Sequence, residues 1–214
     1  MYTAPRRKYG RDRQLKVSIQ TDAQRELLKA AAACILRHGV DKISVEDVAA
    51  EAKVSRRTVY RAFQSKEHLL AALFEWHTLA VTFDKALRHV GGLAFEDAFL
   101  EGTLAGIRAI RRDRLTKEMM YGSGGQWFQK QMLDASSPLS RAVRRIQMKF
   151  WNDILDRARE GGLLNPALTN EQIIEWYTMA QYFLVVRANH AVADQRFVVR
   201  NLLIPSFLKR PTQG

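Results

Sequence analysis

Residues 44–73 read SVEDVAAEAKVSRRTVYRAFQSKEHLLAAL, and this stretch decides the fold. Serine hydroxyls accept hydrogen bonds from the free backbone N–H groups of a first helical turn. Helices are therefore expected to begin after Ser44, Ser55 and Ser65. Four apolar residues follow Ser44 at positions i, i+3, i+4 and i+7, which lie on one side of a helix: Val45, Val48, Ala49 and Ala52. We expect this side to be buried. The stretch predicts short helices joined by tight turns, which must pack on other helices to be stable.

The helix after Ser55 has two chemically different sides. At about 100° per residue, the side expected to face the core carries Val59, Ala62 and Phe63. The opposite side carries Arg57 and Arg61, with Tyr60 beside them. The arginine guanidinium can donate two hydrogen bonds to guanine or to a phosphate, and tyrosine can contact a phosphate or a base edge. This layout is typical of a recognition helix, although charge alone is equally compatible with a solvated amphipathic helix.

Outward from this stretch, the chain is expected to be helical almost throughout. Upstream, Thr21 and Gln24 fit a capping box that opens a helix ending at His38-Gly39. Cys34, the single cysteine, lies among apolar residues of that helix, so it is expected to be buried, and no intrachain disulfide can form. Downstream, we expect helices at about 66–90, 95–113, 115–121, 127–160, 170–191 and 194–208. Ser136-Ser137-Pro138 should kink or interrupt the fourth of these.

The fold class predicted from this pattern is all-α, with about nine helices. The chain is expected to have three parts, and the helices lie in the second and third. Residues 1–20 are polar and rich in basic side chains, so they are expected to form an arm that is either flexible or settles on DNA. Residues 21–65 should form a three-helix DNA-binding unit. Residues 66–214 should form an antiparallel helical bundle.

The charge of the chain favours a polyanionic partner. It carries 34 basic and 22 acidic side chains, a formal net charge of +12, and its pI is about 10.1. Nucleic acid is the first partner this balance suggests, and an anionic membrane surface or acidic ligand the second. No apolar run of about 18 residues and no secretory signal are present, so we expect a cytoplasmic protein that spans no membrane.

An enzyme is not expected. The five histidines are scattered without the spacing of a metal site, and the glycines at 122–125 lack the lysine and strand of a phosphate-binding loop. No catalytic residue, metal or cofactor is therefore predicted.

Residues 44–73 resemble the helix-turn-helix of TetR-type (tetracycline-repressor family) transcriptional regulators. The likeness covers about 21–75 and includes Ala49-Ala50, Val54-Ser55, Thr58-Val59-Tyr60-Arg61, Phe63 and Ser65-Lys66-Glu67. It implies a homeodomain-like unit, a homodimer and a palindromic DNA operator. Operator contacts are implied for Ser44, Ser55, Arg56, Arg57, Thr58, Tyr60, Arg61 and Lys66. Ala62 stands where many members carry a histidine, so that phosphate contact is absent.

The resemblance also implies a small-molecule effector and a dimer. The dimer would form through helices at about 170–191 and 194–208, although a monomer with a thicker core is the alternative. Candidate effector contacts, each of which could equally be plain core, are Phe99, Met120, Trp127, Phe128, Trp151 and Tyr177. The effector is expected to be largely apolar and to act through the long helix at 66–90. A non-specific architectural DNA-binding protein is the alternative function.

Overall fold

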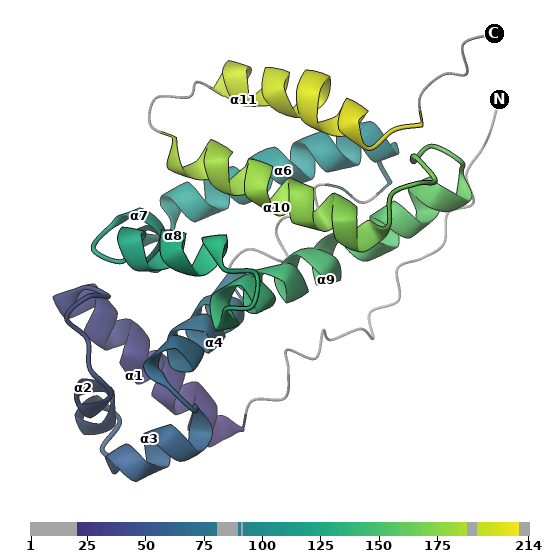
Figure 1. Ribbon diagram of the computed structural model, residues 1–214. Helices are drawn as coiled ribbons and strands as arrows, with labels where there is room; N and C mark the ends of the chain where they lie inside the picture. The colour runs from purple at the N-terminus through teal and green to yellow at the C-terminus, as the bar shows by residue number, and fades with distance from the viewer. Residues whose placement is uncertain (1–20, 81–89, 91, 188–191, 210–214) are drawn as a thin grey trace, which may run out of the picture.

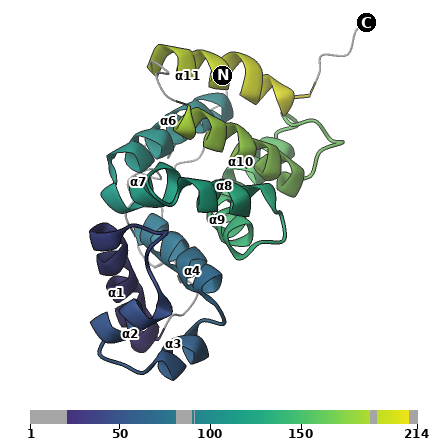
Figure 2. The ribbon, with the colours of Figure 1, turned by 60° about the vertical axis from the view of Figure 1, so that its left-hand side comes forward.

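The computed structural model describes residues 21–80, 90, 92–187 and 192–209. Within these ranges the regular elements are helices, apart from one isolated bridge between Leu164 and Leu208. The chain runs from a three-helix unit at one end to α11 at the other (Figures 1 and 2). The expected arm at 1–20 and the second half of the expected 66–90 helix lie outside the described residues.

The N-terminal unit consists of α1 (Asp22–His38), α2 (Val45–Glu51) and α3 (Arg56–Ala62). Its helix starts are those predicted from the sequence. Thr21 forms a capping box with Gln24, Ser44 forms one with Asp47, and the Ser55 hydroxyl accepts from the Thr58 N–H at 3.2 Å. The unit closes around a buried cluster with members from all three helices, including Leu28, Ile35, Val48 and Val59.

The turn between α2 and α3 passes through a left-handed residue. Lys53 has φ of 54°, the only positive value at a non-glycine position among the described residues. That conformation brings the Lys53 and Val54 N–H groups back onto the carbonyls of Ala50 and Ala49, at 3.1 and 2.9 Å. An L-residue with a Cβ is strained there by about 1–2 kcal/mol, so the turn carries a local cost.

Lys53→Gly is expected to raise the free energy of unfolding by about 0.5 kcal/mol. Relief of the left-handed strain should exceed the entropy that glycine adds to the unfolded chain, about 0.5–1 kcal/mol. Urea denaturation at matched protein concentration measures the difference. The control is Lys42→Gly, which removes the same charge from a turn without positive φ. If Lys53→Gly is no more stable than Lys42→Gly, the turn is not strained.

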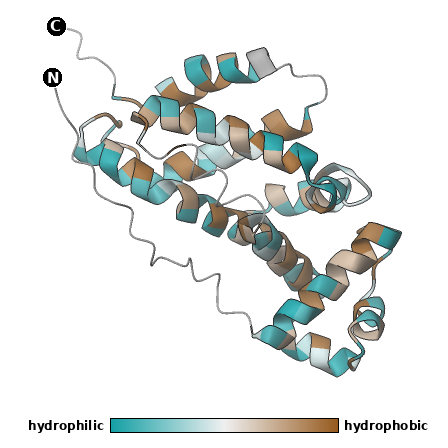
Figure 3. Ribbon diagram, turned by 180° about the vertical axis from the view of Figure 1, so that it is seen from behind, coloured by the Kyte–Doolittle hydropathy of each residue, from teal (hydrophilic) through white to brown (hydrophobic). Residues whose placement is uncertain are grey.

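The rest of the chain forms a helical body around α9. Its helices are α4 (Lys66–Thr78), α6 (Phe95–Arg112), α7 (Arg114–Tyr121), α8 (Gly125–Leu133), α9 (Pro138–Glu160), α10 (Asn170–Val186) and α11 (Val192–Val198). After α11 the chain makes a π-helical segment, Val199–Leu203, and a short 3-10 turn, Ile204–Ser206. Hydrophobic positions continue from the N-terminal unit along α4 into the body (Figure 3).

Ten α-helices are present in the described ranges, against about nine expected, because the stretch at 127–160 is divided. Ser137 begins α9 by accepting from the Ser140 N–H at 3.0 Å, and Pro138 follows it at the first helical position. The Ser137 and Ser140 hydroxyls also donate to the Gln131 carbonyl at 2.7 and 2.8 Å, near the end of α8. The interruption predicted at this site is therefore a complete break.

Polar contacts reinforce the packing of α4 on α9 and of the N-terminal unit on the body, where α1 packs against α4 and α7. On α4, the carboxylate of Glu75 pairs with the Arg145 guanidinium of α9, through Nε at 2.9 Å and through Nη2. At the α1–α2 loop, the Val40 N–H donates to Ser123 Oγ at 2.8 Å, between α7 and α8. Gly39, with φ of 83°, permits this approach, because a Cβ there would lie 2.4 Å from Ser123 Oγ.

Arg145→Met is expected to lower the free energy of unfolding by about 2 kcal/mol. Glu75 is 8% exposed, so it would keep a buried charge without its partner. Breaking a fully buried pair costs about 3–5 kcal/mol, and the exposed position of Arg145 reduces that figure. The comparison is Arg144→Met, whose pair with Glu175 is 4.0 Å long and half-exposed on both sides. Adding Glu75→Gln to Arg145→Met should recover part of the loss; equal stability of Arg145→Met and Arg144→Met would contradict the account.

Candidate functional site

The N-terminus of α3 is fixed against α2 by side chains that the sequence alone did not bring together. Arg56 Nε lies 2.7 Å from Glu46 Oε1, and its guanidinium lies 6.0 Å from the centre of the Tyr60 ring. The ion pair is exposed, so it adds little to stability. It does set the direction in which α3 leaves the turn, and Glu46 is a residue that sequence reasoning missed.

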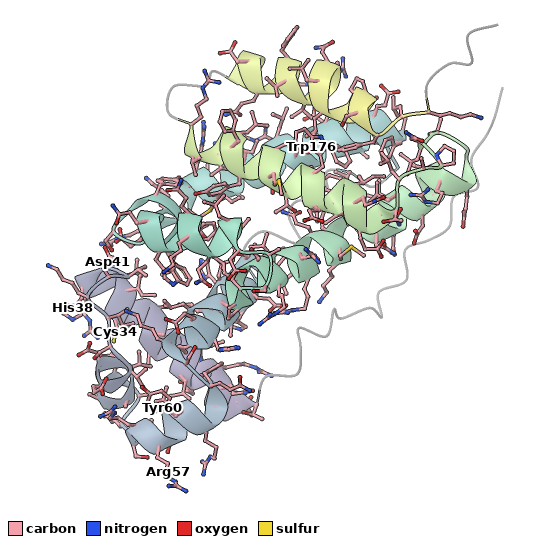
Figure 4. All side chains as sticks on the ribbon, viewed as in Figure 1. Cys34, His38, Asp41, Arg57, Tyr60 and Trp176 are labelled. Atoms are coloured by element: carbon pink, nitrogen blue, oxygen red, sulfur yellow. The ribbon has the colours of Figure 1, made fainter. Side chains whose placement is uncertain are left out.

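Beyond Arg56, the outer side of α3 carries two arginines whose charges are not paired with other described residues. Arg57 and Arg61 are exposed and make no hydrogen bond or ion pair with other described residues, and Tyr60 is 44% exposed. Arg57 points away from the rest of the molecule, at the end farthest from α11 (Figure 4). On the inner side, Val59 and Phe63 are buried, and Ala62 is half-buried, as expected. Guanidinium groups without partners can pair with a polyanion without first breaking an internal contact.

Three of the other predicted DNA contacts, Ser44, Ser55 and Thr58, have hydroxyls that already form hydrogen bonds within the protein. Ser55 Oγ and Thr58 Oγ1 are 3.0 Å apart and satisfy each other. The Ser44 N–H and hydroxyl both donate to Asp47 Oδ2, at 2.8 and 2.6 Å, and these bonds lower the pKa of Asp47 below its ordinary value. An ionised carboxylate therefore occupies the start of α2, where a phosphate was expected. Lys66 is half-buried at the start of α4.

A second feature of the surface is an apolar face on α10 and the segment that follows it. Five large hydrophobic residues, each more than half exposed, make up this face: Trp176, Met179, Phe183, Phe197 and Leu202. The first three repeat at i, i+3 and i+7, which is one side of α10. The two segments are joined by a hydrogen bond from Trp176 Nε1 to Ser206 Oγ at 3.2 Å (Trp176 is labelled in Figure 4). Exposed hydrophobic faces of this kind are typical of surfaces that bind another protein, a membrane or a ligand.

The body also encloses two small cavities, of about 60 and 50 Å³. Four of the six residues predicted to contact an effector line them. Trp151 and Tyr177 line the larger cavity, and Met120 and Phe128 line the smaller one. Burial raises the pKa of Tyr177 far above its ordinary value, so its hydroxyl stays neutral.

The other two predicted effector contacts lie elsewhere in the body. Phe99 is the centre of an aromatic cluster, with ring centroids 4.4 Å from Trp151 and 5.0 Å from Tyr177. Trp127 packs edge-on against Phe128, with ring centroids 6.3 Å apart, and lines neither cavity. Phe99 and Trp127 therefore belong to the packed core in this structure.

Metal and membrane sites were searched over the described ranges. No group of three or more His, Cys, Asp or Glu side chains is placed there to hold a metal ion. None of the helices in these ranges is both long and apolar enough to cross a bilayer.

The N-terminal unit and the whole fold both have known relatives. Residues 27–73 match the family model for bacterial regulatory proteins, tetR family. An uncharacterized HTH-type transcriptional regulator from Mycobacterium bovis is 36% identical over 62 residues, or 29% of this chain and 33% of that protein. The chain thus spans about a third of the length of the curated relatives it matches.

Solved structures extend the likeness to the body. The repressor QsdR of R. erythropolis, from the TetR family, superposes with a TM-score of 0.61 at 15% identity, over 90% of this chain and 98% of that chain. A tetR-family transcription regulator from Shewanella sp. PV-4 superposes with a TM-score of 0.58 at 18% identity, over 89% and 100%. These relatives are transcriptional regulators and not enzymes. Residues 27–73 thus match the DNA-binding unit of bacterial regulatory proteins of the tetR family, and the chain as a whole shares the fold of the solved TetR-family structures.

Proposed function

We propose that this protein is a ligand-responsive repressor, which binds a palindromic operator as a homodimer and is released by a small, largely apolar effector. One observation carries the proposal: α3 turns Arg57, Tyr60 and Arg61 to solvent while its apolar side is held by the unit's core. Repression in particular is supported by the likeness to QsdR, which is described as a repressor. The protein would act in the cytoplasm, beside the DNA it regulates.

The geometry ranks the proposed DNA contacts. Arg57 and Arg61 should contribute most, because they have no hydrogen-bond or ion-pair partner among the described residues, and Tyr60 would give up only its contact with Arg56. Arg56 would have to break its ion pair with Glu46 before it could bind DNA, so its net contribution to operator affinity should be smaller. Ser55 and Thr58 would contact DNA through the oxygen lone pairs and backbone around the helix start. Ser44 and Lys66 would contact phosphates, with Ser44 the weakest because of Asp47.

The apolar face of α10 and the following segment supports a homodimer. A second copy of the chain would cover the same face by two-fold symmetry, which is the usual arrangement of homodimers. The two α3 helices must then lie about 34–36 Å apart, or a multiple of this, to enter successive major grooves. We also propose residues 21–65 as the DNA-binding domain and 66–214 as the effector and dimerisation domain. A DNA contact by residues 1–20 stays a prediction.

Selection of bound genomic fragments by the purified protein tests the function. A repressor of this kind should recover a palindromic site and prefer it to random DNA by about 10³-fold or more at physiological salt. A non-specific architectural protein would instead bind all fragments alike, with strong salt dependence. Recovery of no preferred site would reject the proposed function.

A further inference from the structure

The two cavities in the body are neighbours that share one wall. Five residues line both: Thr78, Ile110, Ile146, Gln147 and Gln181. The polar members of this set, Thr78, Gln147 and Gln181, therefore lie at the boundary between the cavities. We name these three residues the polar junction.

Each cavity continues from the polar junction into an apolar lobe. One lobe lies between α6, α9 and α10 and is lined by Gly102, Gly106, Phe150, Trp151 and Tyr177. The other lies between α4, α7, α8, α9 and α10 and is lined by Phe74, Met120, Phe128, Met132, Val143, Thr178, Tyr182 and Val185. Gly102 keeps the first lobe open toward α9, because a Cβ on it would lie 2.7 Å from the Trp151 ring. Both lobes offer aromatic and aliphatic walls to a ligand.

Hydrogen bonding at the polar junction is incomplete. Gln147 Nε2 donates to Gln181 Oε1 at 2.7 Å, and both residues belong to the wall that the lobes share. Thr78 Oγ1 is buried and has no hydrogen-bond partner. Thr178 differs: its hydroxyl donates to the Ile174 carbonyl at 2.7 Å. A buried hydroxyl without a partner is a costly arrangement, so an acceptor placed beside Thr78 would be bound favourably.

The lining of both lobes is also free of charge. Among the described residues, no Asp, Glu, Lys, Arg or His side chain lines either cavity. An ionised ligand would lose its hydration there without gaining a counter-charge, and that loss is prohibitive in an apolar environment. A neutral ligand with a single hydrogen-bonding group meets no such penalty.

We infer that the two cavities are halves of one effector site, which takes a neutral molecule with a central hydrogen-bond acceptor between two apolar arms. The acceptor receives a hydrogen bond from Thr78 Oγ1 and one from a glutamine amide, and the arms fill the two lobes. Parting Gln147 from Gln181 joins the lobes. At about 60 and 50 Å³ the separate cavities are far smaller than an ordinary ligand site of about 300–1,000 Å³, so binding must open the body. This inference rests on the proposed function and names its effector class.

The position of Thr78 connects this site to the DNA-binding unit. Thr78 is the last residue of α4, and the same turn carries two polar contacts of α4 with its neighbours α9 and α7. Glu75 binds Arg145 of α9, and His77 Nε2 lies 2.8 Å from Asp113 Oδ1 at the start of α7. A ligand that moves Thr78 therefore acts on the turn that fixes α4.

Three probes of matched shape test the inference. They are 1,3-diphenylpropan-2-one, with a central ketone; 1,3-diphenylpropane, without an acceptor; and 2-benzyl-3-phenylpropanoate, with a central carboxylate. Titration of the full chain, followed by tryptophan fluorescence and calorimetry without DNA, gives the affinities. We expect the ketone to bind at least tenfold more tightly than the hydrocarbon, and the carboxylate to bind at least tenfold more weakly than the ketone.

Variants identify the residues that produce the ketone preference. Thr78→Val and Gln147→Leu should each reduce the preference for the ketone over the hydrocarbon several-fold, while Thr178→Val, which loses a satisfied hydroxyl of the same lobe, should keep the preference. The inference is overturned if the carboxylate binds as well as the ketone, if Thr78→Val and Gln147→Leu both keep the preference, or if none of the probes binds. Failure of the proposed function would show separately, as no preferred operator in probe-free fragment selection.

Discussion

Replacing Arg57 and Tyr60 together with alanine is expected to abolish operator binding, with a loss of about 10³-fold or more. Each direct contact is worth about 1–3 kcal/mol, and a dimer on its operator loses four of them. Neither side chain supports the fold: both are exposed, and neither is hydrogen-bonded within the described chain. The circular dichroism spectrum and the oligomeric state should therefore match those of the unchanged protein.

Electrophoretic mobility shift or fluorescence anisotropy on the recovered operator measures this effect. The matched control is Arg114→Ala with Tyr121→Ala, which removes one exposed arginine and one exposed tyrosine from α7. That control should change operator affinity by no more than a few-fold. Operator binding by the Arg57/Tyr60 variant within tenfold of the unchanged protein would mean that α3 is not the DNA-reading helix.

Met179→Glu combined with Phe183→Glu should convert the protein to a monomer. A second copy of the chain would bring four carboxylates into the interface, where they lose hydration and repel one another. Truncation of a central interface residue alone costs about 2 kcal/mol or more, so dimer affinity should fall by about 10³-fold or more. Operator binding should fall with it, because a monomer reaches only one half-site.

Sedimentation velocity over a range of concentrations measures the dimer, and circular dichroism checks the fold. Leu133→Glu is the comparison, since Leu133 is 81% exposed at the end of α8 and is not one of the five residues of the apolar face. It should remain dimeric with normal operator binding. A Met179/Phe183 variant that still dimerises at micromolar concentration would place the interface on another face.

The parts of the fold that depend on local sequence were predictable. Capping boxes at Thr21 and Ser44, and the serine-proline break before α9, are decided by side chains within three or four residues of each other. The apolar spacing of α2 and α3 likewise indicated which sides face the core. The exposed basic side of α3 could be placed from the same spacing, because a short helix with one apolar side has only one way to pack.

The contacts missed from the sequence join residues far apart along the chain. The guanidinium of Arg111 donates to the Leu184 carbonyl at 3.1 Å and so caps the end of α10, from 73 residues away along the chain. The pairing of Gln147 with Gln181 spans 34 residues and has no local signal. One hint was available: Gln181 is a single amide on an otherwise apolar side of α10, and a buried amide requires a partner.

The ties of the N-terminal unit to the body have a mechanical consequence. The unit is held through α4, where Glu75 meets Arg145, and through the α1–α2 loop, where Val40 meets Ser123. Through α1 the unit also packs against α4 and α7, so a twist of α4 is carried into the unit as a whole. α3 lies at the end of the unit away from the body (Figure 1). A small twist of α4 is therefore magnified at Arg57 in proportion to the distance of Arg57 from α4.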